Sequence, residues 1–345
     1  MRNIFPGLLT AMTLLIFACQ QPNSQLATAT SSDFNTGDTG VRYAGIKMIP
    51  VQTPIGTFKV WTKRFGNNPS IKVLLLHGGP AMTHEYMECF ESYFPGQGIE
   101  FYEYDQLGSY YSDQPTDSSL WTIDHFVDEV EQVRKALSLD KSNFFLLGNS
   151  WGGMLALEYA FKYQDNLKGL LICNMMASCP EYGNYAENVL AQQMDPKVLD
   201  TIRQLEARKA FQDPKYMELL MANYYNQHIC RLPELPEPVM RSFKHLNNSI
   251  YTLMQGPSEF GIGGRLANWD RRADLPKIKV PTLTVGAKHD TMDPEHMKWM
   301  STQVQNGTYL FCPNGSHLSM WDDQRVFMNG VIDFIKKVDA ASVKK

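Results

Sequence analysis

The sequence contains no basic stripe and no run of like charges along its 345 residues. Its 32 lysines and arginines are nearly balanced by 36 aspartates and glutamates, which gives a formal net charge of −4. This balance argues against a nucleic-acid partner, because proteins that bind nucleic acids concentrate positive charge on one face. With 43% hydrophobic residues, a chain of this length can bury a large core, as one elaborated domain or as two.

The N-terminal region lacks an apolar run long enough for a comfortable membrane span. The apolar stretch from Leu8 to Ala18, which follows Arg2, is typical of a signal peptide. Residues 15–19, LIFAC, resemble a bacterial lipobox, in which Cys19 becomes the lipidated first residue of the mature protein. Phe17 is bulkier than the residue usual in that motif, and the alternative is an ordinary signal peptide in which Cys19 is incidental.

We therefore expect residues 1–19 to be a lipoprotein-type signal peptide. Residues 20–40 are polar and rich in Ser, Thr, Asn and Gly, which predicts a flexible tether. The protein would then be exported to the bacterial cell envelope, with its folded part in the periplasm or outside the cell. Its contact with the membrane would be made only through the N-terminal lipid.

The cysteines fit neither a small disulfide scaffold nor a zinc motif. If Cys19 carries lipid, an odd number remains, so at least one thiol is free. One or two disulfides are compatible with an oxidising periplasm, but the spacings favour buried free cysteines and no metal site. The remaining cysteines are Cys89, Cys173, Cys179, Cys230 and Cys312.

Apolar runs alternate with a helical pattern over much of the chain, which predicts an α/β fold with a mostly parallel central sheet flanked by helices. Between the second and third runs, residues 122–139 carry apolar side chains at helical spacing. On that helix we expect Asp128, Glu129, Glu131 and Lys135 to face water. The predicted strands are residues 72–76, 99–104, 144–147, 169–173 and 282–285.

This alternation stops between residues 174 and 274, where amphipathic segments are punctuated by the Pro-rich RLPELPEPV and the Gly-rich GPSEFGIGGR. We interpret 174–274 as a helical cap inserted into a core formed by residues 41–173 and 275–345. A second independent domain is the alternative, but strand signals resume after residue 274. A cap over the carboxyl ends of the strands would close a ligand pocket there.

A G-x-S-x-G motif occupies residues 148–152, between a predicted strand and a predicted helix. This layout is typical of a nucleophile elbow, which exposes Ser150 above the sheet on a strained turn. The first N–H groups of the following helix, including that of Trp151, would face a developing oxyanion. The alternative is an ordinary Gly-rich turn, which the flanking strand and helix disfavour.

A serine nucleophile needs a histidine base and an acid that orients the base. In this fold the expected order along the chain is serine, acid, histidine. VGAKHDTMDP offers Asp290 and Asp293, and Asp290 is favoured because it lies nearer the strand end. CPNGSHLSMWDD offers His317, whereas His296 lies on a helix predicted to begin at Pro294.

A second oxyanion donor is expected after the strand at 72–76, where the sequence reads LLLHGGPAM. Gly78 and Gly79 would let the backbone approach a substrate closely, and His77 before them is interpreted as structural. An N–H near Gly79 would complete an oxyanion hole with the N–H of Trp151. A single donor of this kind is typically worth roughly 10²–10³ in rate.

Several motifs together resemble the proline iminopeptidases, including the tricorn-interacting aminopeptidase branch, within the α/β-hydrolase superfamily. The resemblance covers about residues 41–338. It implies a serine exopeptidase that removes an N-terminal residue, often proline, and needs no cofactor. Ser150 would attack, His317 would act as base, Asp290 would orient it, and the Gly79 and Trp151 N–H groups would bind the oxyanion. The motifs are HGGP (77–80), DQLGSYYSD (105–113), GNSWGG (148–153), KYQDNLKGL (162–170), GPSEF (256–260) and GSHLSMW (315–321).

The same resemblance implies that Glu259 binds the free amine of the substrate, because a buried ammonium must be paired. A second family glutamate usually follows the triad aspartate, but this chain has Thr291 there. Asp293 or Glu295 could compensate, but the favoured interpretation of each is a solvated surface acid. Two further departures are Ala81 and Tyr110, where the family has glycine.

Three functions follow in order of preference. The first is an aminopeptidase acting on a small peptide or amino-acid-derived substrate. The second, motivated by Thr291, is an esterase, amidase or lactonase with the same triad and no need for a free amine. The third is a non-catalytic binding lipoprotein, which the complete set of Ser150, Asp290 and His317 disfavours.

Overall fold

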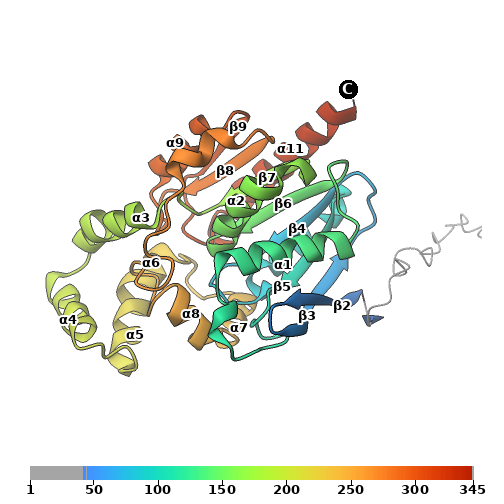
Figure 1. Ribbon diagram of the computed structural model, residues 1–345. Helices are drawn as coiled ribbons and strands as arrows, with labels where there is room; N and C mark the ends of the chain where they lie inside the picture. Colours follow the sequence, from blue (N-terminus) through green and yellow to red (C-terminus); the bar gives the residue numbers. More distant parts are fainter. Residues whose placement is uncertain (1–41, 44, 344–345) are drawn as a thin grey trace, which may run out of the picture. The chain divides into compact units, whose positions relative to one another are not determined.

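The computed structural model describes residues 42–43 and 45–343. Within them, one nine-stranded sheet forms the centre of the protein, in the order β1-β2-β3-β5-β4-β6-β7-β8-β9 (Figure 1). The predicted α/β-hydrolase architecture with a mostly parallel sheet is confirmed. The strands are β1 (Arg42–Tyr43), β2 (Ile46–Thr53), β3 (Gly56–Phe65), β4 (Lys72–Leu76), β5 (Glu100–Asp105), β6 (Phe144–Asn149), β7 (Gly169–Cys173), β8 (Thr282–Ala287) and β9 (Gly307–Cys312).

The five predicted strands are β4 to β8, and each pairs in parallel with its neighbours among them. Strand β9 extends this parallel part beyond β8, whereas β1, β2 and β3 pair antiparallel at the other edge. The sequence did not predict these four strands. In β2 only Ile49 and Val51 are buried, and such half-polar alternation does not form the continuous apolar run of a buried parallel strand.

Alternate side chains of the central strands enter two separate hydrophobic cores, one on each face of the sheet. Leu74 and Leu76 of β4 belong to the core covered by helices α1, α2 and α9. Val73 and Leu75 belong to the core covered by α11 and the 3₁₀ segment η2. These elements are α1 (Ile123–Ala136), α2 (Trp151–Tyr163), α9 (Pro294–Gln303), α11 (Gln324–Val343) and η2 (His84–Ser92).

Helix α1 corrects one expectation, because Glu129 and Glu131 are buried rather than exposed to water. The Glu129 carboxylate accepts hydrogen bonds from the Tyr104 hydroxyl and, at 3.0 Å, from the Leu107 N–H. Glu131 accepts from Arg134 at 2.7 Å. Helical periodicity identifies the apolar face, but it does not show which polar side chains find partners inside.

A group of helices between β7 and β8 lies at the end of the sheet where the parallel strands terminate (Figure 1). They fall within the segment predicted as a cap, and the boundaries at residues 174 and 274 stay predictions. Two π-helical segments interrupt them, including η8 (Met221–Tyr225). The helices are α3 (Cys179–Tyr185), α4 (Pro196–Ala207), α5 (Pro214–Leu220), α6 (Asn226–His228), α7 (Glu237–Lys244) and α8 (Asn248–Met254), with α10 (Ser319–Asp322) lying later in the chain.

The five cysteines within the described residues are free and buried, as the sequence predicted. No helix in this part of the chain is both long and apolar enough to cross a membrane. Cys19, the proposed signal peptide and the tether at 20–40 lie outside the described residues.

Candidate active site

Ser150 lies on a sharp turn between β6 and α2, with φ +57° and ψ −129°. Positive φ is strained for a residue with a side chain, so the surroundings must hold it in place. Its carbonyl accepts from the N–H of Gly153 at 2.7 Å, and its N–H donates to the Cys173 carbonyl at 3.0 Å. A side chain at Gly148 would collide with the Gly152 backbone, which explains the glycine on the strand side of the motif.

His317 and Asp290 meet at the carboxyl end of the sheet, in the loops after β9 and β8. His317 Nδ1 lies 2.8 Å from Asp290 Oδ1, and both side chains are buried. Burial lowers the pKa of His317, but the neighbouring Asp290 carboxylate outweighs burial and raises it above 6.5 overall. His317 Nε2 is buried with no hydrogen-bond partner among the described residues, so it can receive a proton.

Asn174, at the end of β7, holds the acid and is a site residue that sequence reasoning missed. Its Nδ2 donates to Asp290 Oδ2 at 2.7 Å, and its Oδ1 accepts from Ser319 at 3.1 Å and from Asn149 at 3.4 Å. Asn174 has φ +53°, a left-handed conformation that asparagine tolerates better than most residues. Its place at a strand end was the only available signal, because no motif includes it.

The loop after β4 approaches Ser150 from the neighbouring strand. The Gly78 N–H donates to the Tyr86 hydroxyl at 2.7 Å, and that hydroxyl donates to Asn149 Oδ1 at 3.0 Å. Gly79 has φ +111°, and a Cβ there would lie 2.7 Å from the N–H nitrogen of Met82. The structure therefore requires glycine at 79, one of the two positions predicted to supply an oxyanion donor.

Trp151, the other position predicted to supply an oxyanion donor, is the first residue of α2, where a backbone N–H has no acceptor within the helix. Its buried indole donates to Gln106 Oε1 at 2.8 Å. Gln106 in turn donates its backbone N–H to His77 Nε2 at 3.1 Å. His77 thus ties two loops together, consistent with the structural role expected from the sequence.

The other acids and histidines near the sheet edge have partners of their own. Asp293 caps α9 by accepting from the Glu295 N–H at 2.9 Å, and Glu295 is exposed beside Lys298. His296 Nε2 accepts from the Ala177 N–H at 3.3 Å. Of the two aspartates, Asp290 is therefore the one that contacts His317.

Thr291 is fully buried beside the acid and the histidine. Its hydroxyl oxygen lies 3.3 Å from Asp290 Oδ1 and 3.2 Å from His317 Nδ1. The position that carries a glutamate in the family therefore contributes a small neutral hydroxyl here. Neither Asp293 nor Glu295 replaces the missing carboxylate, because one caps a helix and the other faces solvent.

Tyr110, a second departure from the family pattern, is 51% exposed and connects the 105–113 loop to the cap. Its ring stacks on His245 at a centroid distance of 3.8 Å and an interplanar angle of 9°. His245 Nδ1 also contacts the buried Glu85 carboxylate at 2.8 Å. Ala81 departs as well, with φ +61° and a carbonyl that accepts from the Asn247 N–H at 3.1 Å.

Glu259 borders a cavity of about 450 Å³ beneath the cap helices. Its carboxylate accepts from the Tyr251 hydroxyl at 2.5 Å, and burial raises its pKa above 4.5. Methionines, aromatic rings and leucines form most of the wall, so the carboxylate is the main charged group facing an apolar space. The lining residues are Met82, Met217, Met221, Tyr225, Leu235, Met240, Phe243, Leu246, Asn248, Tyr251, Pro257 and Glu259.

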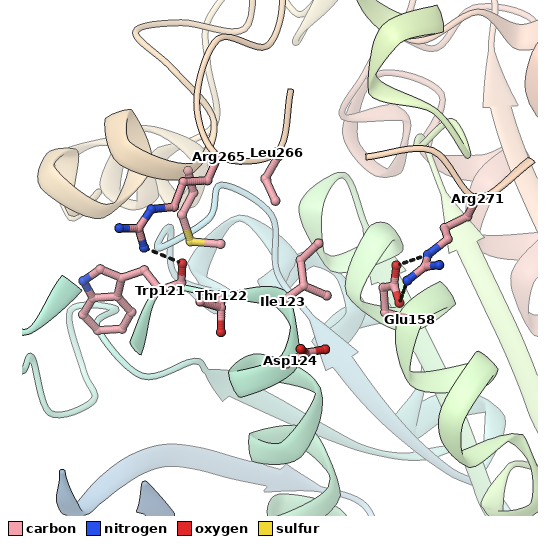
Figure 2. Close-up of a pocket in the computed structure, with 9 residues that line it drawn as sticks. Trp121, Thr122, Ile123, Asp124, Glu158, Arg265, Leu266 and Arg271 are labelled. Atoms are coloured by element: carbon pink, nitrogen blue, oxygen red, sulfur yellow. Dashed lines mark hydrogen bonds and ion pairs between the residues drawn. The ribbon is translucent and has the colours of Figure 1, made fainter. Parts of the chain in front are cut away.

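A second cavity of about 320 Å³ lies between the start of α1, helix α2 and the chain that follows α8. Figure 2 shows Arg265 directed at the Trp121 carbonyl and Arg271 paired with Glu158, on opposite sides of the view. None of the predicted site residues lines this cavity, whereas Glu259 lines the cap cavity. The cap cavity is therefore the better candidate for a substrate site.

The fold has clear relatives among known proteins. A family model described as the alpha/beta hydrolase fold matches residues 72–324. The solved structure of VinJ superposes with a TM-score of 0.79 at 29% identity, covering 84% of this chain and 98% of that one. The structure of proline iminopeptidase from Mycobacterium smegmatis gives 0.76 at 27% identity, covering 85% and 99%. The protein is thus an α/β-hydrolase.

Sequence comparison gives a narrower family. The chain is 68% identical over 296 residues to a proline iminopeptidase of Flavobacterium johnsoniae, covering 86% of this chain and all of that protein. It is 67% identical over 297 residues to one of Elizabethkingia meningoseptica, covering 86% and 99%. The chain belongs to the proline iminopeptidase family, which confirms the family predicted from its motifs.

Proposed function

We propose that the protein is a serine aminopeptidase that removes N-terminal proline, or another residue, from short peptides. Ser150 attacks the carbonyl carbon of the first residue while His317 Nε2 takes the hydroxyl proton. Asp290 orients His317 and stabilises its charged form. His317 then protonates the departing amine, and water attacks the acyl-enzyme by the reverse sequence. The observation that carries the proposal is the buried contact of 2.8 Å between His317 and Asp290, beside the strained turn of Ser150.

The oxyanion of each tetrahedral intermediate would be bound by the N–H groups of Gly79 and Trp151. The first belongs to a loop that requires glycine, and the second opens a helix whose dipole favours negative charge. All the groups needed for acyl transfer are then supplied by the chain itself, and the mechanism requires no cofactor.

Recognition of a free amine is assigned to Glu259 beneath the cap. An ammonium that enters an apolar space is costly unless it meets an opposite charge, and this carboxylate is the charged group of the cavity wall. Holding the amine there would place the first peptide bond, and no later bond, near Ser150. The cap cavity would thereby restrict the enzyme to the N-terminal residue.

The test is hydrolysis of chromogenic anilides of proline, alanine and other residues, each with a free and with an acetylated amine. The proposal predicts cleavage of the free-amine set only, with proline among the preferred residues. In Glu259→Gln, the KM for free-amine substrates should rise. Equal or faster cleavage of the acetylated set would instead support an esterase, amidase or lactonase, the alternative that Thr291 motivates.

Export and lipid anchoring through Cys19 form a separate part of the proposal, supported by the apolar stretch at 8–18 and the lipobox-like LIFAC. The mature enzyme would then act on peptides outside the cytoplasm. Labelling of cells with an alkyne fatty acid tests this directly. The full-length protein should be labelled, and Cys19→Ser should not. Equal labelling of both proteins, or of neither, would contradict anchoring through Cys19.

A further inference from the structure

Tyr86, on the 3₁₀ segment η2, is a buried residue that the proposed mechanism does not use. Its hydroxyl accepts from the Gly78 N–H at 2.7 Å and donates to Asn149 Oδ1 at 3.0 Å. A Cβ at Gly78 would lie 3.0 Å from Ser150 Cβ and 3.2 Å from the Tyr86 hydroxyl oxygen. The hydroxyl therefore contacts residues 77–81, the oxyanion loop, at the point where their backbone passes beside Ser150.

Both hydrogen bonds of the Tyr86 hydroxyl are made with groups of the protein. Burial raises the pKa of Tyr86 well above 10, so the hydroxyl keeps its proton and donates it to Asn149 Oδ1. Its oxygen accepts from the Gly78 N–H, which is itself buried. Any effect of Tyr86 on the reaction must therefore pass through the oxyanion loop.

The two glycine N–H groups of this loop differ in their partners. The Gly78 N–H is engaged by Tyr86, whereas no residue in the described part of the chain accepts from the Gly79 N–H. Because a backbone N–H is an obligatory donor, one without a protein acceptor is available for a ligand. This difference selects Gly79 over Gly78 as the oxyanion donor.

The peptide unit between Gly78 and Gly79 is held from its other side by His77. His77 Nε2 accepts from the Gln106 N–H at 3.1 Å, which leaves the ring proton on Nδ1. Nδ1 then donates to the Gly78 carbonyl at 2.8 Å. Because the carbonyl and N–H of a trans peptide point in opposite directions, this bond turns the Gly79 N–H away from His77. Gly78 is thus fixed at its N–H by Tyr86 and at its carbonyl by His77.

Asn149 connects Tyr86 to the serine turn and to the acid. It is the residue before Ser150, and its Nδ2 lies 3.4 Å from Asn174 Oδ1. Asn174 in turn donates to Asp290 Oδ2 at 2.7 Å. One series of buried hydrogen bonds therefore joins the oxyanion loop to the segments that carry the proposed triad.

We propose that Tyr86 is a positioning residue of the oxyanion hole, whose hydroxyl holds the Gly78 N–H so that the Gly79 N–H faces the oxyanion. The inference rests on the proposed acyl transfer at Ser150 and adds a residue that acts through the loop. Without the hydroxyl, the buried Gly78 N–H would lose its acceptor and the loop would move to satisfy it. A misplacement of about 1 Å in an active site can cost about 10² in rate.

Tyr86→Phe tests the hydroxyl, because it keeps the ring. On the best anilide of the wild type, kcat should fall by on the order of 10–10², with KM changed less than about twofold, because the donor acts in the transition state. The acidic limb of the pH profile should keep its wild-type midpoint, since His317 and Asp290 are untouched. Tyr159→Phe is the matched control, since it removes a buried hydroxyl that donates to Glu131 at 2.9 Å, and it should keep the wild-type kcat.

The α-aminoboronic acid that corresponds to the best substrate measures the same effect without turnover. The serine oxygen adds to boron, and one oxygen of the tetrahedral adduct takes the place of the oxyanion. Its inhibition constant should rise in Tyr86→Phe by the factor by which kcat falls. Wild-type kcat in folded Tyr86→Phe would overturn the proposal. A fall in kcat with unchanged boronate affinity, or with a shifted acidic midpoint, would overturn it as well.

A crystal structure of the wild-type boronate adduct does not depend on the folding of a variant. It should show a boron-bound oxygen accepting from the Gly79 N–H, with the Gly78 N–H still donating to Tyr86. A boron-bound oxygen on the Gly78 N–H or on the Tyr86 hydroxyl would overturn the proposal. If the wild type neither cleaves any anilide nor binds the boronate, the proposed function fails instead, so the two failures are distinguishable.

Discussion

The side-chain amide of Asn174 donates to Asp290 Oδ2 at 2.7 Å, on the opposite oxygen from the one that contacts His317. Asn174 also accepts from Asn149, the residue before Ser150, and from Ser319, two residues after His317. One buried side chain thus touches the three segments that carry the proposed triad. The hydrogen bond from Asn174 orients the Asp290 carboxylate so that its other oxygen can accept a hydrogen bond from the imidazole N–H of His317.

Loss of the Asn174 amide should therefore reduce turnover without preventing substrate binding. We expect Asn174→Gly to lower kcat about tenfold with little change in KM, because one hydrogen bond to the carboxylate is lost. Glycine is the suitable replacement, since it accepts the φ of +53° without strain. Steady-state kinetics on the prolyl anilide measure both constants, and a wild-type kcat would show that Asn174 has no positioning role.

Asp290→Asn tests the acid more severely. Asparagine keeps the size of the side chain but removes the charge, so the imidazolium that forms during catalysis loses its stabilisation. We expect kcat to fall by on the order of 10⁴, the scale seen when a triad aspartate is replaced in this way. Asp293→Asn is the matched control and should retain activity, because Asp293 only caps α9. If the two variants lost activity equally, the assignment of Asp290 would be wrong.

The pH dependence of kcat/KM should show an acidic limb set by His317. Burial lowers the pKa of His317, but Asp290 outweighs burial and raises it above 6.5. Protonated His317 cannot accept the Ser150 proton, so activity is lost as pH falls through that raised value. The midpoint should therefore lie above 6.5, and residual activity in Asp290→Asn should show a lower midpoint. A wild-type midpoint below 6.5 would contradict this account.

Arg241 of cap helix α7 forms ion pairs with two glutamates of the core segment η2. These are the buried Glu85, at 3.0 Å, and Glu88, at 2.9 Å. Arg241→Met should destabilise the fold by about 1–2 kcal/mol, less than a fully buried pair would cost because the Arg241 side chain is 30% exposed. Urea denaturation at neutral pH measures this. Lys298→Met, which removes an exposed pair with Glu295, should change stability by less than about 0.5 kcal/mol.

The contribution of the Arg241–Glu85 ion pair to stability should depend on pH. Burial alone would raise the pKa of Glu85, but hydrogen bonds from Thr83, His245 and Tyr111 lower it below 4.5 overall. A lowered carboxyl pKa contributes stability above the unfolded value of about 4.5, and this contribution is lost as pH falls through the folded value. In Glu85→Gln the loss of stability between neutral and acidic pH should therefore be shallower than in the wild type. An identical dependence in both proteins would exclude this role.

Sequence patterns predicted those parts of the fold that have a local physical cause. The elbow at Ser150 could be predicted because glycines flank it for steric reasons, and Asp290 and His317 because they follow strands in the expected order. Asn174 could not be predicted, because its role depends on partners 116 and 145 residues away along the chain.

The prediction that Glu129 faces water is wrong for a related reason. Its carboxylate is buried because its partners, Tyr104 and Leu107, belong to β5 and the following loop. Strand β2 could not be predicted because polar and apolar residues alternate along it, and β3 could not because only Val60, Trp61 and Thr62 of its residues are buried.

Comparison of the wild-type enzyme with Ser150→Ala tests the central claim most directly. Initial rates on prolyl anilide should fall by at least about 10⁴ in Ser150→Ala, with an unchanged thermal transition and substrate still bound. In the wild type, fluorophosphonate should label one residue, Ser150, and abolish the same activity. Substantial turnover by pure, folded Ser150→Ala, or labelling at another residue that abolishes activity, would contradict the assignment of this serine as the nucleophile.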